Sequence, residues 1–260
     1  SQSCELPPSF KKNLAGAKAA LGRFSAEKPI TWTHYGDGEW MCVCDIGLSS
    51  NSDGASLRGE GCKEFGQNLR SYGKLGPHFF VAHANAFICG PGTLFDQVET
   101  CIKDVRKNEW DNSSKWEGFT EGFYFPLVPA CAPRGSGPAE TLAGRHVVLV
   151  GPEHLKGLHA LLGHQEYISV PQSSAWDEMD RIQAEMLKAS KAADHVTFIC
   201  AGGPAMKVVL FRLFPEIGDK DTMIEVGSSL DGFAGKASRD YNNDISRFCR
   251  QYGRWMAKGV

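Results

Sequence analysis

The second half of the chain alternates short β-branched runs with helical stretches, and this pattern restricts the fold more than any other feature. Runs rich in Val, Ile, Thr and Phe occupy 146–150, 167–170, 195–200 and 222–226. Each of the first three is followed by a stretch in which apolar residues recur at helical spacing. Strands that alternate with helices in this way form a parallel sheet with helices on both faces.

The first half of the chain shows the same two kinds of element less regularly. A β-branched and aromatic run predicts a strand at 30–35, and a second strand is predicted at 78–83. Helices are expected within 8–26, near 60–73 and near 91–107. We therefore predict an α/β, Rossmann-like fold whose mostly parallel sheet carries helices on both faces.

The chain is long enough for one large domain or two small ones, since it has 260 residues. The continuous alternation of elements favours a single domain over 1–260. An aromatic-rich insertion interrupts the pattern at about 108–140, where Trp, Phe and Tyr occur among Gly, Asn and Pro. This insertion is interpreted either as a lid or acceptor-binding face, or as a buried loop excursion.

Charge and hydropathy argue against two classes of partner. Lys plus Arg is 28 and Asp plus Glu is 30, giving a net charge of −2. This balance gives no reason to expect nucleic acid or an anionic membrane as the main partner. No apolar run approaches the roughly 20 residues that cross a bilayer, so no membrane span is predicted.

The nine cysteines are scattered and odd in number, which is not typical of a disulfide framework. Reduced, mostly buried thiols are expected, with a structural zinc site at Cys42 and Cys44 as the minor alternative. Reduced thiols favour a cytoplasmic location, in a bacterium or in the cytosol of a virus-infected host. A luminal location stays open if an N-terminal anchor was removed, because Asn112 lies in a glycosylation sequon.

Small polar segments follow nearly every predicted strand. In an open parallel sheet, ligands lie outside the carboxyl ends of the strands. This rule selects the segments that are expected to form the ligand site: 36–39, 83–85, 151–153, 171–174, 202–204 and 227–231.

The segment Gly202-Gly203-Pro204 joins a predicted strand to a helix that is expected to run to Phe214 and carries Lys207 early in its length. Glycines let the backbone approach an anion closely, and the free amides and dipole of a helix N-terminus favour phosphate. We predict that Gly202, Gly203 and Lys207 contact the phosphates of a ligand. The alternative is a tight strand-to-helix turn that binds nothing.

Two acids, Asp37 and Glu39, flank a glycine at the end of the strand at 30–35. Gly36 and Gly38 free both carboxylates from regular strand pairing, so that both can turn toward one hard cation. Mg²⁺ or Mn²⁺ is commonly held by one or two carboxylates together with diphosphate oxygens. The alternative is a polar turn whose acids cap backbone amides.

The sequence Tyr-Gly-Asp-Gly-Glu-Trp at 35–40 resembles the Arg-Phe/Tyr-Gly-Asp-Gly-Glu signature of the GT-D-type glycosyltransferases. Further motifs of that family follow in its order and spacing over roughly 30–241: Gly-Pro at 151–152, Val-Pro-Gln-Ser-Ser at 170–174, Ala-Gly-Gly-Pro-Ala-Met-Lys at 201–207 and Glu-Val-Gly-Ser-Ser-Leu-Asp at 225–231. The resemblance implies a Rossmann-like fold and a DxE motif that binds a divalent metal with the UDP of a sugar donor. Asp37 and Glu39 are then the DxE acids. His34 departs from the family, which usually has arginine there, and this puts the identity of the donor in doubt.

An acid after the last predicted strand, Asp231, is the candidate base. An inverting transfer needs a group that takes the proton of the acceptor hydroxyl, and a carboxylate within hydrogen-bond reach can do so. Asp177 and Glu178 are rival candidates, and Asp231 as the cap of a turn is the alternative.

Other residues are also predicted to contact the donor. Arg239 suits a diphosphate, because guanidinium matches phosphate geometry. Ser173 or Ser174 is a donor contact or a helix N-cap. His83 and Asn85, at the end of a strand, are candidates for sugar or ribose contacts, with a structural histidine as the alternative reading.

The sequence thus leads to a metal-dependent glycosyltransferase that uses Mn²⁺ or Mg²⁺. It would move a sugar from a UDP-sugar to a hydroxyl of a glycan, with inversion through a carboxylate base. The alternative is a carbohydrate- or nucleotide-binding module of the same fold. The donor sugar, the acceptor, the stereochemical course (inverting or retaining) and the oligomeric state are left open.

Overall fold

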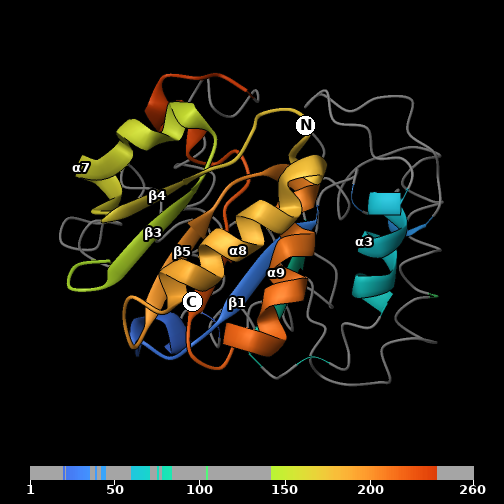
Figure 1. Ribbon diagram of the computed structural model, residues 1–260, viewed down its shortest axis with the longest axis horizontal. Helices are drawn as coiled ribbons and strands as arrows, with labels where there is room; N and C mark the ends of the chain where they lie inside the picture. Colours follow the sequence, from blue (N-terminus) through green and yellow to red (C-terminus); the bar gives the residue numbers. More distant parts are fainter. Residues whose placement is uncertain are drawn as a thin grey trace, which may run out of the picture.

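In the computed structural model, the described residues are 20, 22–35, 39, 42–44, 60–70, 75, 78–83, 104 and 142–238. Six strands among them form one all-parallel sheet with the order β2-β1-β6-β5-β3-β4 (Figure 1). The strands are β1 Thr31–Tyr35, β2 Phe79–His83, β3 His146–Gly151, β4 Glu166–Ser169, β5 Val196–Cys200 and β6 Thr222–Glu225. Every strand that the sequence predicted is present, and the predicted α/β, Rossmann-like class is confirmed.

The connections between the strands are helical. The helices are α3 Glu60–Arg70, η4 Glu153–Leu158, α7 His159–Leu162, η5 Ala175–Glu178, α8 Met179–Ser190, α9 Gly203–Ile217 and η6 Asp231–Ala234. Residues 22–25 are also helical, as expected within 8–26. The predicted helix at 91–107, apart from Asp104, and the aromatic-rich insertion at 108–140 lie outside the described residues.

Helices cover both faces of the sheet. Figure 1 shows α8 and α9 side by side across one face, and their apolar side chains pack with Val148, Val150 and Phe198 of the sheet. Residues from η4 and α7 pack on the other face, against side chains such as Val147 and Leu149. Because successive side chains of β3 point to opposite faces and both faces are buried, the strand reads as a continuous apolar run.

Helix α9 is the most deeply buried of these connections. It runs from Gly203 to Ile217, three residues beyond the predicted end at Phe214, and it includes Pro215 in its last turn. A proline lacks the N–H that would bond to the carbonyl four residues before it, and α9 ends within one turn of this residue. The helix starts at the carboxyl end of β5 and so presents its first turns to the edge of the sheet where ligands are expected.

The cysteines differ from the expectation of reduced thiols. Cys42 and Cys44 are both disulfide-bonded, so neither is a free thiol. Cys200 in β5 is free and buried, as expected. Disulfides persist mainly in oxidising compartments, so Cys42 and Cys44 do not support a cytoplasmic location. No helix in the described part of the chain is long and apolar enough to cross a bilayer.

Candidate functional site

The carboxyl ends of β1 and β6 separate from each other. Their pairing ends at Trp32 and Ile224, although both strands continue beyond this point. The side chain of Glu225 takes the place of the next ladder contact, because its Oε2 lies 3.4 Å from the main-chain N–H of His34. The strands connect to elements on opposite faces of the sheet, an arrangement that favours a ligand crevice at the strand ends.

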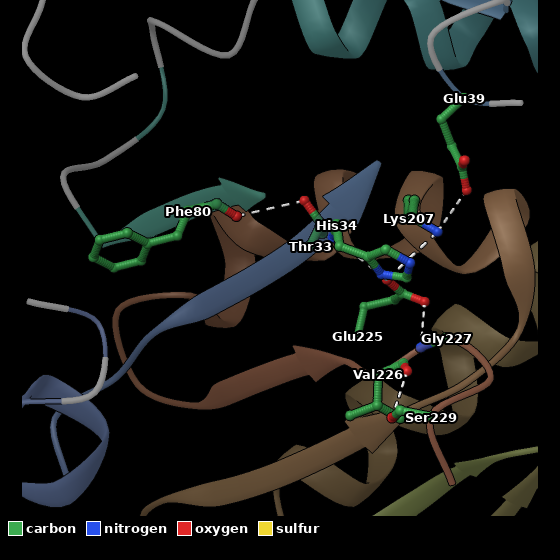
Figure 2. Close-up of polar contacts among 9 residues, drawn as sticks. All are labelled: Thr33, His34, Glu39, Phe80, Lys207, Glu225, Val226, Gly227 and Ser229. Carbon is green, nitrogen blue, oxygen red and sulfur yellow. Dashed lines mark hydrogen bonds and ion pairs between the residues drawn. The ribbon is translucent and has the colours of Figure 1, made fainter. Parts of the chain in front are cut away.

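Four charged or ionisable side chains meet at this point, and Figure 2 shows them around Lys207. The Lys207 Nζ lies 2.8 Å from Oε1 of Glu39 and 3.4 Å from Oε2 of Glu225. His34 Nδ1 lies 2.5 Å from the same Oε2 of Glu225. Glu39 follows β1, Lys207 belongs to α9 and Glu225 ends β6, so three separate segments supply the cluster.

Burial and mutual attraction together determine the charge states of this cluster. The side chains of Lys207 and Glu225 are 1% and 0% exposed. Burial alone raises the pKa of Glu225, but His34 and Lys207 outweigh it and lower that pKa to about 2. Burial likewise raises the pKa of Glu39, and Lys207 and His34 reverse this and hold it below its usual value. Burial lowers the pKa of Lys207, but Glu225 and Glu39 raise it by more, so the pKa of Lys207 lies above its usual value. Both carboxylates and the ammonium are therefore ionised at neutral pH.

Gly227 closes the cluster from the loop after β6. Its N–H donates a hydrogen bond of 2.8 Å to Oε1 of Glu225. Its φ of +54° lies in the left-handed region, and a Cβ at this position would lie 2.6 Å from Cε1 of His34. Only glycine satisfies both constraints, so the turn depends on this residue type.

A second polar cluster lies on the loops after β3 and β6. Nε2 of His154, in η4, lies 2.7 Å from Oδ1 of Asp231, in η6. The Ser238 hydroxyl donates to Oδ2 of the same carboxylate. The helices η4 and η6 pack against each other, which brings the His154 and Asp231 side chains together from distant parts of the sequence.

The glycine pair at the start of α9 occupies the place that the sequence predicted. Gly203 has a φ of +62° and open space beside its Cα, whereas a Cβ on Gly202 would lie 3.0 Å from Cγ1 of Val170. Gly202 is thus required for packing, and Gly203 for the backbone turn into the helix. The contact of either glycine with phosphate stays a prediction.

The Lys207 side chain is buried and does not reach into solvent. Its Nζ is enclosed by the carboxylates of Glu39 and Glu225 at the buried side of the site. The predicted phosphate contact of Lys207 is not tested by these contacts. They do assign the residue a second role, which is to hold Glu39 in place.

The remaining predicted residues are only partly described. Asp37, Gly36, Asn85 and Arg239 lie outside the described residues, and so does the side chain of His83, whose backbone ends β2. Ser173 is exposed. Ser174 stands at the N-cap of η5 without a side-chain capping bond. Of the rival acids, Glu178 is bound by Arg181 and Asp177 is exposed.

The described residues supply one candidate ligand for a divalent cation rather than a complete set. No group of three or more His, Cys, Asp or Glu side chains suited to a metal occurs within the described ranges. Glu39 fits the role of a single ligand, because it is ionised and lies beyond the carboxyl end of β1, and metal-binding carboxylates must be deprotonated. One or two such carboxylates suffice where diphosphate oxygens complete the coordination of Mg²⁺ or Mn²⁺.

Sequence reasoning did not single out three residues of these clusters: His34 as a partner of Glu225, Glu225 itself, and His154. Glu225 and His34 each stand at the end of a predicted strand, and a charged residue ending an otherwise apolar strand was the available signal. His154 offered no such signal, since its partner lies 77 residues away in the chain.

Searches of protein-family models, curated proteins and solved structures found no match to this chain.

Proposed function

We propose that this protein is a glycosyltransferase that moves a sugar from a UDP-sugar to a hydroxyl of a glycan with the help of Mn²⁺ or Mg²⁺. The observation that carries the proposal is the buried ion cluster of Glu39, Lys207 and Glu225 at the carboxyl edge of the sheet. Buried ionised groups are costly and are frequent at functional sites, where they hold reacting groups in place.

The sequence motifs at this edge of the sheet indicate which ligands the site would bind. Glu39 is the second acid of the segment that resembles the DxE motif of GT-D-type glycosyltransferases, and it is the acid that the cluster fixes. Gly203 and the N-terminus of α9 lie at the same edge of the sheet and suit the phosphates of a nucleotide. Glu39, Gly203 and the N-terminus of α9 therefore all lie at the edge where ligands of parallel sheets bind.

Each residue has a physical task in this proposal. Lys207 keeps Glu39 ionised and fixes its position, and Glu225 neutralises Lys207 while it binds His34 and Gly227. Asp37 and Glu39 would hold the cation, which when bound neutralises charge on the leaving diphosphate. The His154 and Asp231 cluster stands on the neighbouring loops, where an acceptor hydroxyl needs a proton acceptor.

The test is UDP release from a panel of UDP-sugars, measured with Mn²⁺ and with EDTA, on the wild type and on Asp37→Asn. We expect release from one donor that requires Mn²⁺ and is lost in the variant. Asp219→Asn is the matched control, because Asp219 is 97% exposed and its carboxylate pairs with His78 just before the start of β2, at the opposite edge of the sheet. It should keep the wild-type rate.

Two results would speak against the proposal. UDP release that is unaffected by EDTA and by Asp37→Asn would remove the metal and its acids from the mechanism. Mn²⁺-dependent UDP binding without release from any donor would instead indicate a nucleotide-binding module.

A further inference from the structure

The carboxylate of Asp231 is enclosed by hydrogen-bond donors. Its side chain is 9% exposed, Oδ1 lies 2.7 Å from Nε2 of His154, and Oδ2 accepts from the Ser238 hydroxyl. Both oxygens are thus engaged within the protein. This arrangement suits a group that orients a neighbour better than one that takes a proton from a substrate.

The neighbour that Asp231 orients is more accessible. The His154 side chain is 21% exposed, and Nδ1 has no hydrogen-bond partner among the residues that the structure describes. A carboxylate can only accept, so Nε2 of a neutral His154 carries the ring hydrogen and Nδ1 carries the lone pair. The Asp231 contact therefore prepares Nδ1 to accept a proton.

The position of the pair fits this chemistry. His154 follows the carboxyl end of β3, and Asp231 follows that of β6, so both loops border the edge of the sheet where ligands lie. The strand between them in the sheet is β5, whose own loop carries Gly202 and Gly203. The pair and the glycine turn consequently face one region.

We infer that His154 is the catalytic proton acceptor and that Asp231 is its positioning residue; this inference rests on the proposed function. The acceptor hydroxyl oxygen forms a bond to the anomeric carbon while the bond from that carbon to the UDP oxygen breaks. The bonding pair leaves with UDP. The hydroxyl proton passes to Nδ1 of His154, and the resulting imidazolium, held by Asp231, later loses the proton to water.

The decisive variant is His154→Ala. UDP release from the active UDP-sugar is measured with water and with a panel of free monosaccharides as acceptors. We expect kcat to fall roughly 10²–10⁴-fold, the range for loss of a general base, and UDP affinity to stay unchanged. Free imidazole added to the assay should restore part of the lost rate, which a purely structural histidine would not allow.

Asp231→Asn tests the positioning role. The asparagine amide donates to Nε2, so the ring hydrogen moves to Nδ1 and the lone pair is lost from the reacting position. We expect a loss of similar size to that in His154→Ala, no further loss in the double variant, and a change of tautomer in the ¹⁵N NMR spectrum of His154. His146→Ala is the control, because His146 pairs with Glu166 at 2.9 Å at the start of β3 and should keep full activity.

The possible failures are distinguishable. If Asp231 itself takes the proton, Asp231→Asn loses activity while His154→Ala keeps most of it, and the inference is wrong. If His154→Ala loses activity without imidazole rescue and with weakened UDP binding, the residue is structural and the inference is again wrong. If the wild type releases no UDP from any donor, the proposed function fails, and the catalytic role of His154 fails with it.

Discussion

Replacing Lys207 by methionine tests the buried ion cluster directly. Methionine keeps an unbranched apolar side chain of similar length in a position that is 1% exposed, so packing changes little. The ammonium is lost, and two buried carboxylates, Glu39 and Glu225, lose their common counter-charge.

The expected loss of stability follows from the burial of the pair. Removing one partner of a buried pair typically costs about 3–5 kcal/mol, because a buried charge is left uncompensated. His34 lowers the pKa of Glu225 more than Lys207 does, so Glu225 keeps part of its stabilisation in the variant. The expected loss is still a large part of a typical unfolding free energy of about 5–15 kcal/mol.

The pH dependence gives the prediction its sign. Because the folded-state pKa of Glu225 is lowered, its stabilising contribution is complete above pH 4.5 and is lost as the pH falls toward about 2. In Lys207→Met, Glu39 loses the group that most lowers its pKa, so burial raises that pKa and protonation of Glu39 relieves the variant at mildly acidic pH. His34 continues to lower the pKa of Glu225. The stability deficit should therefore be largest at pH 7 and smaller near pH 4.5.

Urea denaturation followed by circular dichroism at both pH values measures this deficit. Lys156→Met is the control, because the pair of Lys156 with Glu153 spans 3.8 Å and is exposed; it should change stability by less than about 1 kcal/mol. A deficit in Lys207→Met as small as that in the control, or one that does not change with pH, would refute the reasoning.

Three further predictions concern the surroundings of the cluster. Gly227→Ala should displace the His34 ring, lower the stability by about 1–3 kcal/mol and reduce activity. Gly235→Ala is the control: its φ is +75° but a Cβ there has open space, so it should cost only backbone strain and leave activity unchanged. Melting curves and UDP release measured on both variants test this. Asp221→Asn should destabilise by about 1–3 kcal/mol in urea denaturation, because the buried Asp221 carboxylate accepts from the Val196 N–H and the Ser190 hydroxyl; wild-type stability would contradict this. The Cys200 thiol should resist alkylation at pH 8 until the protein unfolds, since burial and Glu225 raise its pKa well above its usual value; mass spectrometry of the native, labelled protein would reveal the contrary.

Much of the fold was predictable because local patterns agree with the global arrangement. Each strand of the second half is a β-branched run bounded by small residues, and each was found at its expected place within one or two residues. The helix α9 continues three residues beyond its predicted end at Phe214 and includes Pro215, although proline disfavours a position inside a helix.

The site was less predictable, because its contacts join distant segments. The sequence indicated that Glu39, Lys207 and Asp231 lie near strand ends, but not that Lys207 is buried between two acids. Nothing local relates Lys207 to Glu225, or His154 to Asp231, since each pair forms only when separate loops meet at one edge of the sheet. The chain order of the motifs indicated the location. The packing of α9 against β1 and β6, and of η6 against η4, determined the partners.

The measurement that bears most directly on the proposed function is the affinity of UDP for the protein, determined by calorimetry with Mn²⁺ and with EDTA on the wild type and on Glu39→Gln. We predict binding that requires Mn²⁺ and that weakens at least about tenfold in Glu39→Gln, as one lost ligand of a shared cation would cause. Equal UDP affinity in EDTA, or wild-type affinity in Glu39→Gln, would contradict the assignment of a metal-dependent nucleotide site to this edge of the sheet.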